Sequence, residues 1–344
     1  MLLLVVSGCT WVYDAQYDDR AAELEAARTE FLPANDRVQF MTADRDRFYW
    51  VSLEKPLDEP LLHAVRPDPD PQIEMESRVT FEATRGQTDI AEFHFSNTYV
   101  LECDFNRANL YDAVNGIVAT TDQASSVCAI DAGTTSYFLV NRELRRWDGT
   151  PTAPVTLMQL DDAGVGDGSI GGFGVLGGSP LLVEGGRLWR LDIGGKTAEW
   201  LENESPAQGL VVFDERGVLY DSNDGVKYTQ FSDHATFSLE DAIADGGYRL
   251  SSQQPDIHLL ADDGAYTLYG RYVIYRGQRG IFAYGLDTKK VTDLLLDRGE
   301  SFETKPHYVF PTVTSNGSLF VLDKGFSSSD IGPVYRVELS DRLR

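Results

Sequence analysis

The sequence has few cations for its size: 30 Lys and Arg residues stand against 54 Asp and Glu among 344 residues, a formal charge of −24. Nucleic-acid binding needs clustered Lys and Arg to displace counterions from phosphates, and anionic lipid surfaces attract the same residues. The charge balance therefore argues against nucleic acid as a ligand. It does not argue against a folded domain, because hydrophobic residues make up 42% of the chain and allow a sizeable core.

Signatures of membrane spans and of common catalytic sites are also missing. No apolar stretch approaches the roughly 20 residues that a transmembrane helix needs. The motifs G-x-S-x-G and G-x-x-x-x-G-K-[ST] are absent, and no histidine has a second histidine two to five residues further on. The sequence therefore predicts no catalytic residue and no bound cofactor.

A short motif stands at the N-terminus, where Val6-Ser7-Gly8-Cys9 follows the apolar run Leu2–Val6. It resembles the lipobox of bacterial lipoproteins. The resemblance implies a signal peptide at residues 1–8, a lipid on Cys9 and attachment to a membrane of the bacterial cell envelope. Because Thr10 rather than Asp follows the cysteine, it further implies the outer membrane. The alternative is a buried N-terminal strand with a free thiol at Cys9.

This signal peptide is shorter than those of the lipoprotein family. The family has Lys or Arg ahead of the apolar stretch, whereas Leu2 directly follows Met1 here. We therefore expect the true start of translation to lie upstream.

Only three cysteines are present, and assigning Cys9 to lipid leaves Cys103 and Cys128 as a candidate disulfide. Disulfides persist in the extracytoplasmic compartments to which lipoproteins are exported. Closing this loop would stabilise the fold by roughly 3–4 kcal/mol in the chain-entropy model. Two separate buried thiols are the alternative.

Residues 14–31 are rich in Ala, Glu and Arg and contain neither Gly nor Pro, so they predict a helix that begins after an Asp cap. Two interpretations are open. Residues 9–36 form a tether between the lipidated cysteine and the domain, or the helix is docked on the domain.

From Arg37 onward short aromatic or alternating runs end at Gly, Asn and Asp, which is typical of an all-β fold. An aromatic strand that runs into a polar turn recurs seven times, at a mean spacing of about 48 residues, close to the ~40–50 of a four-stranded propeller blade. These seven segments begin at Phe48, Leu110, Leu144, Leu188, Val226, Ile281 and Val334. We predict a single β-propeller over residues 37–344 with seven blades; six or eight are the alternatives.

A second repeated element is a hairpin whose acidic or amide turn ends in Gly133, Gly217, Gly264 or Gly317. Together with the segment Trp189-Arg-Leu-Asp-Ile-Gly-Gly195, these hairpins resemble TolB-like propeller repeats. The Ser-Pro-Asp-Gly turn of that family is absent, so the resemblance implies no function. We also expect residues 37–40 to pair beside residues 334–339, because this pairing would close the last blade and cover its exposed edge.

Two loops differ from the rest in composition. Residues 54–76 are rich in proline and acid, which predicts a stiff, exposed insertion. Residues 161–178 hold eight glycines, which predicts a segment that is mobile or tightly looped against a neighbour. Asp161, Asp162 and Asp167 lie in this run and are candidate calcium ligands, with a solvated turn as the alternative.

These observations favour a non-enzymatic, membrane-tethered scaffold that binds a protein or glycan partner through the loops at one end of the propeller. The alternative is an extracytoplasmic enzyme of the lactonase or glycoside-cleaving kind, with an axial metal or carboxylates from several blades. Three or more Asp, Glu, Asn or His side chains meeting at one point would favour the enzyme.

Overall fold

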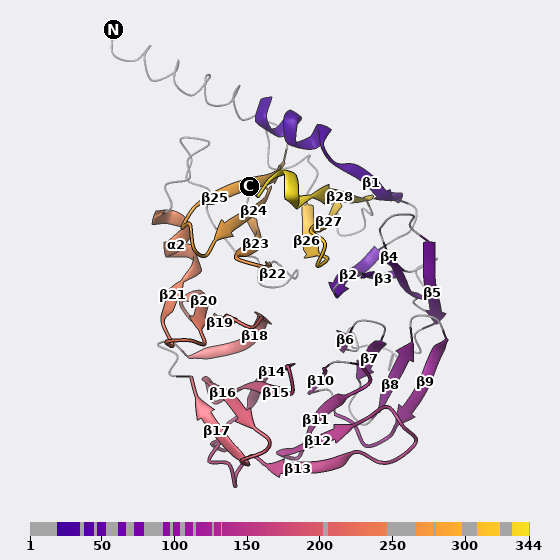
Figure 1. Cartoon of the computed structure of the whole chain (residues 1–344), viewed down its shortest axis with the longest axis vertical. Helices are drawn as coiled ribbons and strands as arrows, with labels where there is room; N and C mark the ends of the chain where they lie inside the picture. The colour runs from indigo at the N-terminus through magenta and orange to yellow at the C-terminus, as the bar shows by residue number, and fades with distance from the viewer. Residues whose placement is uncertain are drawn as a thin grey trace. The chain divides into compact units, whose positions relative to one another are not determined.

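The structure is a computed structural model of the whole chain. It describes residues 19–34, 38–44, 47–52, 61–66, 72–78, 92–96, 99–103, 107–112, 115–125, 127–131, 133–201, 206–245, 266–277, 280–297, 308–323 and 332–343. Its strands form seven four-stranded antiparallel sheets (Figure 1). The fold is therefore a seven-bladed β-propeller, and the predicted all-β class and blade number are confirmed.

Two compact units make up the chain, residues 1–42 with 239–344 and residues 43–238. The first unit contains a helix at residues 19–26 and the helix α2 (Leu239–Asp245). It also contains two blades. One comprises β22 (Tyr266–Tyr269), β23 (Tyr272–Gly277), β24 (Gly280–Gly285) and β25 (Val291–Leu296); the other comprises β26 (Tyr308–Val313), β27 (Ser318–Asp323), β28 (Val334–Glu338) and β1 (Thr29–Leu32), and is followed by the 3-10 helix η3 (Leu339–Asp341).

Four blades lie wholly within the second unit. They are formed by β6 (Glu92–Ser96), β7 (Tyr99–Cys103), β8 (Ala108–Asp112) and β9 (Gly116–Thr121); by β10 (Cys128–Ile130), β11 (Ser136–Val140), β12 (Glu143–Trp147) and β13 (Val155–Gln159); by β14 (Ile170–Leu176), β15 (Ser179–Glu184), β16 (Arg187–Asp192) and β17 (Thr197–Trp200); and by β18 (Ala207–Phe213), β19 (Gly217–Ser222), β20 (Gly225–Gln230) and β21 (Thr236–Ser238). The remaining blade comprises β2 (Val38–Asp44), β3 (Arg47–Ser52), β4 (Leu61–Arg66) and β5 (Gln72–Arg78).

The core lies between neighbouring sheets, because successive side chains of a strand point to opposite faces. In β11, Phe138 packs with Leu101 and Leu110 of the preceding blade. Tyr137 and its neighbour two positions on, Leu139, pack with Leu182 of the following blade. The central strands are therefore buried on both faces, which explains their aromatic and aliphatic composition.

The aromatic segments coincide with one position in the blade. Six of the seven form the third strand: β8, β12, β16, β20, β24 and β28. The first segment, at Phe48, is instead the second strand β3, and the third strand of that blade is β4. This shift explains why the first interval in the sequence is longer than the others.

The predicted proline-rich insertion at residues 54–76 is wrong in part. Residues Leu61–Arg66 form β4, whose first five side chains are buried. The prolines flank this strand instead of interrupting it, since Pro60 precedes it and Pro67 follows it. Proline is tolerated at these positions because it removes no hydrogen bond from the centre of the sheet.

The predicted closure of the last blade occurs, but through an earlier segment. Strand β1, not residues 37–40, pairs antiparallel with β28, and Thr29 lies opposite Arg336. Residues 38–40 belong to β2, at the edge of another sheet. The predicted helix over 14–31 ends at residue 26 in its described part, and the strand follows within three residues.

The helix at residues 19–26 is docked on the domain, as the second interpretation stated. Leu24 and Ala21 are fully buried, and Arg20 Nε donates to Asp293 Oδ2 at 3.0 Å. The guanidinium of Arg28 lies 3.7 Å from the ring centroid of Tyr335. These contacts hold the N-terminal segment against the first unit.

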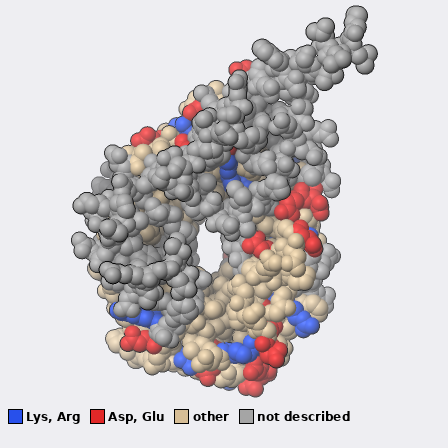
Figure 2. Space-filling model, turned by 180° about the vertical axis from the view of Figure 1, so that it is seen from behind, with Lys and Arg blue, Asp and Glu red and all other residues tan. Residues whose placement is uncertain are grey.

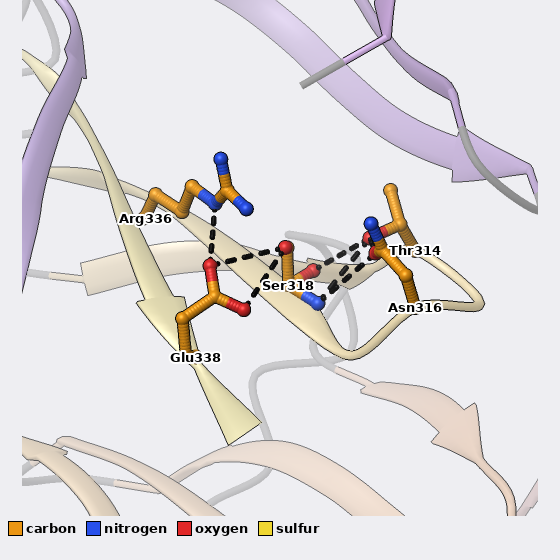
Figure 3. Close-up of polar contacts among 5 residues, drawn as sticks. All are labelled: Thr314, Asn316, Ser318, Arg336 and Glu338. Carbon is orange, nitrogen blue, oxygen red and sulfur yellow. Dashed lines mark hydrogen bonds and ion pairs between the residues drawn. The ribbon is translucent and has the colours of Figure 1, made fainter. Parts of the chain in front are cut away.

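Three of the four repeated hairpins connect the first two strands of a blade, and Gly264 lies outside the described residues. Figure 3 shows the hairpin between β26 and β27, in which Thr314 donates to Asn316 and Ser318 Oγ donates to Glu338 at 3.2 Å. Arg336 Nε donates to the same carboxylate at 2.6 Å. Gly317 has a φ of +90° in this turn, a backbone conformation that glycine adopts without steric cost.

Candidate functional site

One end of the blades in the second unit gathers the features that sequence analysis singled out. Strands alternate in direction, so the turn between the second and third strands lies at the same end as the loop that leads to the next blade. We call this end the loop face. Its described residues are 122–125, 141–142, 160–169, 185–186, 206–208 and 223–224.

A disulfide joins two blades at the loop face. Cys103 is the last residue of β7 and Cys128 is the first residue of β10, and the two sulfurs are bonded. Both cysteines are buried in a cluster with Leu101 and Trp147. The predicted Cys103–Cys128 pair is present, whereas Cys9 lies outside the described residues.

The next contact between a turn and a loop of this face is made by the side chain of an arginine. Asn141 and Arg142 have φ values of 50° and 65°, which fits a two-residue hairpin turn between β11 and β12. Arg142 Nε donates to Asp161 Oδ1 at 2.5 Å. The guanidinium also donates to the carbonyl oxygens of Val165 and Gly168 at 3.4 Å and to that of Gly166. One side chain therefore binds four acceptors of loop 160–169, which its fork of N–H donors suits.

A buried carboxylate holds the same loop from the other side. Glu184, the last residue of β15, is 3% exposed and accepts a hydrogen bond from the backbone N–H of Gly168. A Cβ added at Gly168 would lie 2.7 Å from this carboxylate. The glycine-rich run is thus tightly looped against a neighbouring strand, which is one of the two predicted states.

The three candidate calcium ligands do not converge. Asp161 is bound by Arg142, while Asp162 and Asp167 are exposed. Within the described ranges, no three His, Cys, Asp or Glu side chains come together in a way that would hold a metal ion. The predicted solvated turn describes these aspartates better than a calcium site does.

Three further contacts continue the series. The backbone N–H of Ala207 donates to Gly186 O at 2.9 Å and that of Gly185 to Ser169 O at 3.1 Å. Gln208 Nε2 donates to Asn223 Oδ1 at 2.5 Å. Each turn of the loop face is therefore fixed to the loop beside it, through a disulfide, an arginine or backbone hydrogen bonds.

Most side chains that the face presents to solvent are acidic or amide groups. These are Asp122, Gln123, Asn141, Asp161, Asp162, Asp167, Gln208, Asn223 and Asp224, and Ser169 and Pro206 are exposed beside them. Such groups bind amides and hydroxyls through hydrogen bonds. The described part of this face has no pair of nucleophile and base. The arrangement can bind a polar ligand through hydrogen bonds.

Two polar clusters inside the second unit are enclosed. Glu102 Oε2 accepts from Tyr111 at 2.5 Å and from Asn109 at 2.8 Å. Burial, and then the Glu102 carboxylate, raise the pKa of the Tyr111 hydroxyl. His63 Nε2 lies 2.7 Å from Ser52 Oγ, and both residues are buried. Because these residues are buried, we assign them to the fold.

Arg142 and Glu184 were not found from the sequence. Both act on a loop that lies 16 or more residues from them, and neither lies in a recognised motif. The only local signal is the dipeptide Asn141-Arg142 in a short hairpin turn. In such turns Asn is commonly followed by Gly, so an arginine at the second position is unusual.

No family model matches the sequence, and no curated protein matches it. Solved structures do match. One is PorZ, a bacterial surface component of the type-IX secretion system of Porphyromonas gingivalis, with 11% identity and a TM-score of 0.50 over 90% of this chain and 38% of that chain. Another is the extracellular domain of BT4673 from B. thetaiotaomicron, with 10% identity and a TM-score of 0.51 over 90% and 40% of the two chains.

This chain thus spans less than half the length of these two proteins. At these identities the likeness shows the propeller fold. Among the described residues, no helix has the length and apolar character needed to cross a bilayer.

Proposed function

We propose that the chain is a lipid-anchored, extracytoplasmic β-propeller that binds a protein or glycan partner through the loop face. The observation that carries the proposal is the series of contacts that fixes neighbouring turns and loops: Cys103–Cys128, Arg142 with loop 160–169, and Gly186 with Ala207. Fixed loops lose little conformational entropy when a partner binds, so a rigid face favours affinity.

Three observations support the extracytoplasmic location. The segment Val6–Cys9 resembles a lipobox, and Cys9 would carry the lipid. The disulfide requires an oxidising compartment. The titles of the two similar structures name a bacterial surface component and an extracellular domain. Thr10 after the cysteine supports the outer membrane as the destination.

The polar character of the loop face supports a hydrogen-bonding partner. Its exposed aspartates and amides match the N–H groups of a protein and the hydroxyls of a glycan equally well. The strongly acidic chain argues against nucleic acid as that partner.

Site-specific photocrosslinking in the producing bacterium tests the binding face. A photoreactive amino acid replaces Asn141, Asp162 or Asn223 on the loop face, and, as controls, Thr150 or Lys196 in turns at the opposite end of the blades. We expect adducts with one envelope protein or glycan from the loop-face positions only. Equal adducts from both ends, or none from the loop face, would contradict the proposal.

A further inference from the structure

The exposed apolar side chains occupy one kind of position. Among the described residues, the large hydrophobic side chains with the greatest exposure are Val155 (61%), Ile117 (49%), Val118 (45%) and Trp200 (43%). All four lie on the fourth strand of a blade, β9, β13 or β17, which pairs with only one strand in its sheet. Such edge strands usually carry charged residues that prevent association, yet β13 (Val155–Gln159) has none.

Val155 and Trp200 face each other's blades. Val155 pairs with Arg146, and Arg146 pairs with Tyr137, so the three share one face of their sheet. Tyr137 belongs to the apolar cluster that also contains Trp189 of the next blade. Trp200 pairs with Trp189 and therefore lies on the face that looks back toward Tyr137.

The same two strands also carry partly buried apolar side chains. Leu157 of β13 and Ala198 of β17 pack against the same apolar cluster. We call Val155, Leu157, Ala198 and Trp200, together with Arg146 and Arg187, the rim patch.

The rim patch carries positive charge in an otherwise acidic chain. The guanidinium of Arg187 lies 5.1 Å from the ring centroid of Trp200. Arg146 is half-exposed and lies 3.2 Å from Asp148. Residues 133–201 hold eight acidic and six basic residues, whereas the whole chain holds 54 and 30. Figure 2 shows basic and acidic side chains side by side along the lower edge of the molecule, where Figure 1 places β12, β13 and β17.

We propose that the rim patch binds an extended, acidic segment of a partner protein that also carries apolar side chains. The inference goes beyond the proposed loop-face function, because it names a second binding surface and the class of partner that this surface takes. The uncharged edge of β13 offers backbone N–H and C=O groups for strand addition. Val155 and Trp200 bind the apolar side chains, and Arg187 and Arg146 bind the carboxylates.

The charges and the ring geometry favour this occupant over two others. A second copy of the chain brings a net charge of −24 and would place the two arginines of one patch against those of the other. A sugar stacks on an open aromatic face, but Arg187 already lies over the ring of Trp200. Trp and Arg are also the residue types that dominate the binding energy of protein interfaces.

A phage-displayed library of random dodecapeptides, panned against the full chain, tests the inference. We expect the enriched peptides to combine Asp or Glu with apolar residues. For the best peptide, made synthetically, Trp200→Ala should weaken binding about 30-fold. Arg187→Glu should weaken it as strongly, and Arg187→Lys much less. The matched control is Ile117→Ala on β9, an equally exposed edge residue, which should leave the affinity unchanged.

Thermal midpoints equal to that of the wild type establish that the Trp200 and Arg187 variants are folded. The inference is overturned if the selected peptides are basic, if none is enriched, or if Trp200→Ala binds them as the wild type does. Self-association of the wild type that Trp200→Ala abolishes would assign the patch to a second copy, and loss of glycan binding in that variant would assign it to a sugar. Peptides that depend on Asp162 and not on Trp200 would overturn the inference while leaving the proposed loop-face function intact.

Discussion

Arg142 connects a hairpin turn to the glycine-rich loop 160–169. Its guanidinium holds one carboxylate and three carbonyl oxygens, and Glu184 holds the same loop through Gly168. Leu160 and Val165 of the loop are also buried in the apolar cluster between the two blades. A single substitution at Arg142 measures what the polar contacts add to this packing.

Replacing Arg142 with Ala should release loop 160–169. The substitution leaves several carbonyl groups to water, so we expect a loss of about 1–3 kcal/mol in the free energy of unfolding and faster amide hydrogen exchange in the loop. The control is Arg146→Ala, on the strand β12 that follows the turn, because its ion pair with Asp148 is exposed and should contribute no more than about 1 kcal/mol. Unchanged exchange in the loop of Arg142→Ala would show that the loop is held without Arg142, by Glu184 and by the buried Leu160 and Val165.

The carboxyl groups of Asp221 and Glu143 should contribute to the stability of the folded protein with opposite dependence on pH. Burial raises the pKa of the Asp221 carboxyl above its ordinary 3.8. The folded state then binds more protons than the unfolded state, and stability falls as pH rises from 3.8 through the folded pKa. Asp221→Asn removes this penalty, so it should raise the urea midpoint at pH 7 and have little effect at pH 3.

For Glu143 the dependence of stability on pH has the opposite sign. A hydrogen bond from Arg145, followed by one from Gln159, lowers the pKa of the Glu143 carboxyl below its ordinary 4.5. Its stabilisation is present above pH 4.5 and is lost as pH falls through the folded pKa. Glu143→Gln should therefore lower the urea midpoint at pH 7 and not at pH 3. The same sign for both substitutions at pH 7 would contradict these assignments.

At the scale of the secondary-structure element, the disulfide fixes the end of β7 to the start of β10. The chain-entropy model gives about 3–4 kcal/mol for a loop of this length. We expect the double variant Cys103→Ser with Cys128→Ser to lose stability by that amount, measured by urea unfolding. Cys9→Ser is the control and should have the wild-type midpoint. A loss below about 1 kcal/mol would mean that packing of the two blades already fixes these strands.

Strand β1 is the second element whose removal should matter. Deleting residues 1–18 keeps the helix and β1, whereas deleting residues 1–32 removes Leu24, Phe31 and the partner of β28. Phe31 lies 4.9 Å from Phe320 between ring centroids, and Leu24 is fully buried. We expect the longer deletion to cost at least about 3 kcal/mol more than the shorter one. Equal thermal midpoints would show that β28 does not need this partner.

Strands could be predicted from the sequence where their amino-acid composition depends on their position in the blade. The third strands are buried on both faces and run into polar turns, so aromatic residues next to Asp or Gly identified six of them. The first blade differed because β3 is richer in aromatic residues than β4, although both are buried. Aromatic content reports burial, and it does not report strand order.

The strand β1 could not be predicted for a local reason. Thr29–Leu32 follows the helix without Gly or Pro, and its four side chains are exposed or only partly buried. Nothing in these residues marks the change from helix to strand. The strand exists because β28 offers a free edge, which is a property of residues some 300 positions away.

At the scale of the whole molecule, seven blades and one disulfide followed from the sequence, while the binding surfaces did not. Blade number depends on a repeat that can be counted. The loop face and the rim patch depend on which loops and strand edges meet after folding. Val155, Arg187 and Trp200 are unremarkable in the sequence and become a patch only through the pairing of β13, β16 and β17 with their neighbours.

The proposed membrane attachment concerns the whole molecule, and one residue tests it. If Cys9 is lipidated, the protein expressed from its natural start should enter the detergent phase on Triton X-114 partitioning, because an acyl chain adds about 0.8 kcal/mol of membrane affinity per buried methylene. Cys9→Ala should move it to the aqueous phase, and Cys103→Ala, the control, should not. Wild type and Cys9→Ala in the same phase would remove the lipid anchor from the proposed function.

The pairing of β1 with β28 also has a consequence for biosynthesis. Arg28 reaches Tyr308, 280 residues later in the chain, so the segment that leaves the ribosome among the first finds its partners among the last. At 5–20 residues per second the wait is on the order of 15–60 s. Throughout that time Phe31 and Leu32 have no strand to cover them, and a chaperone that binds short apolar segments would compete for them. Premature release of an unfinished chain would leave this blade without its third strand.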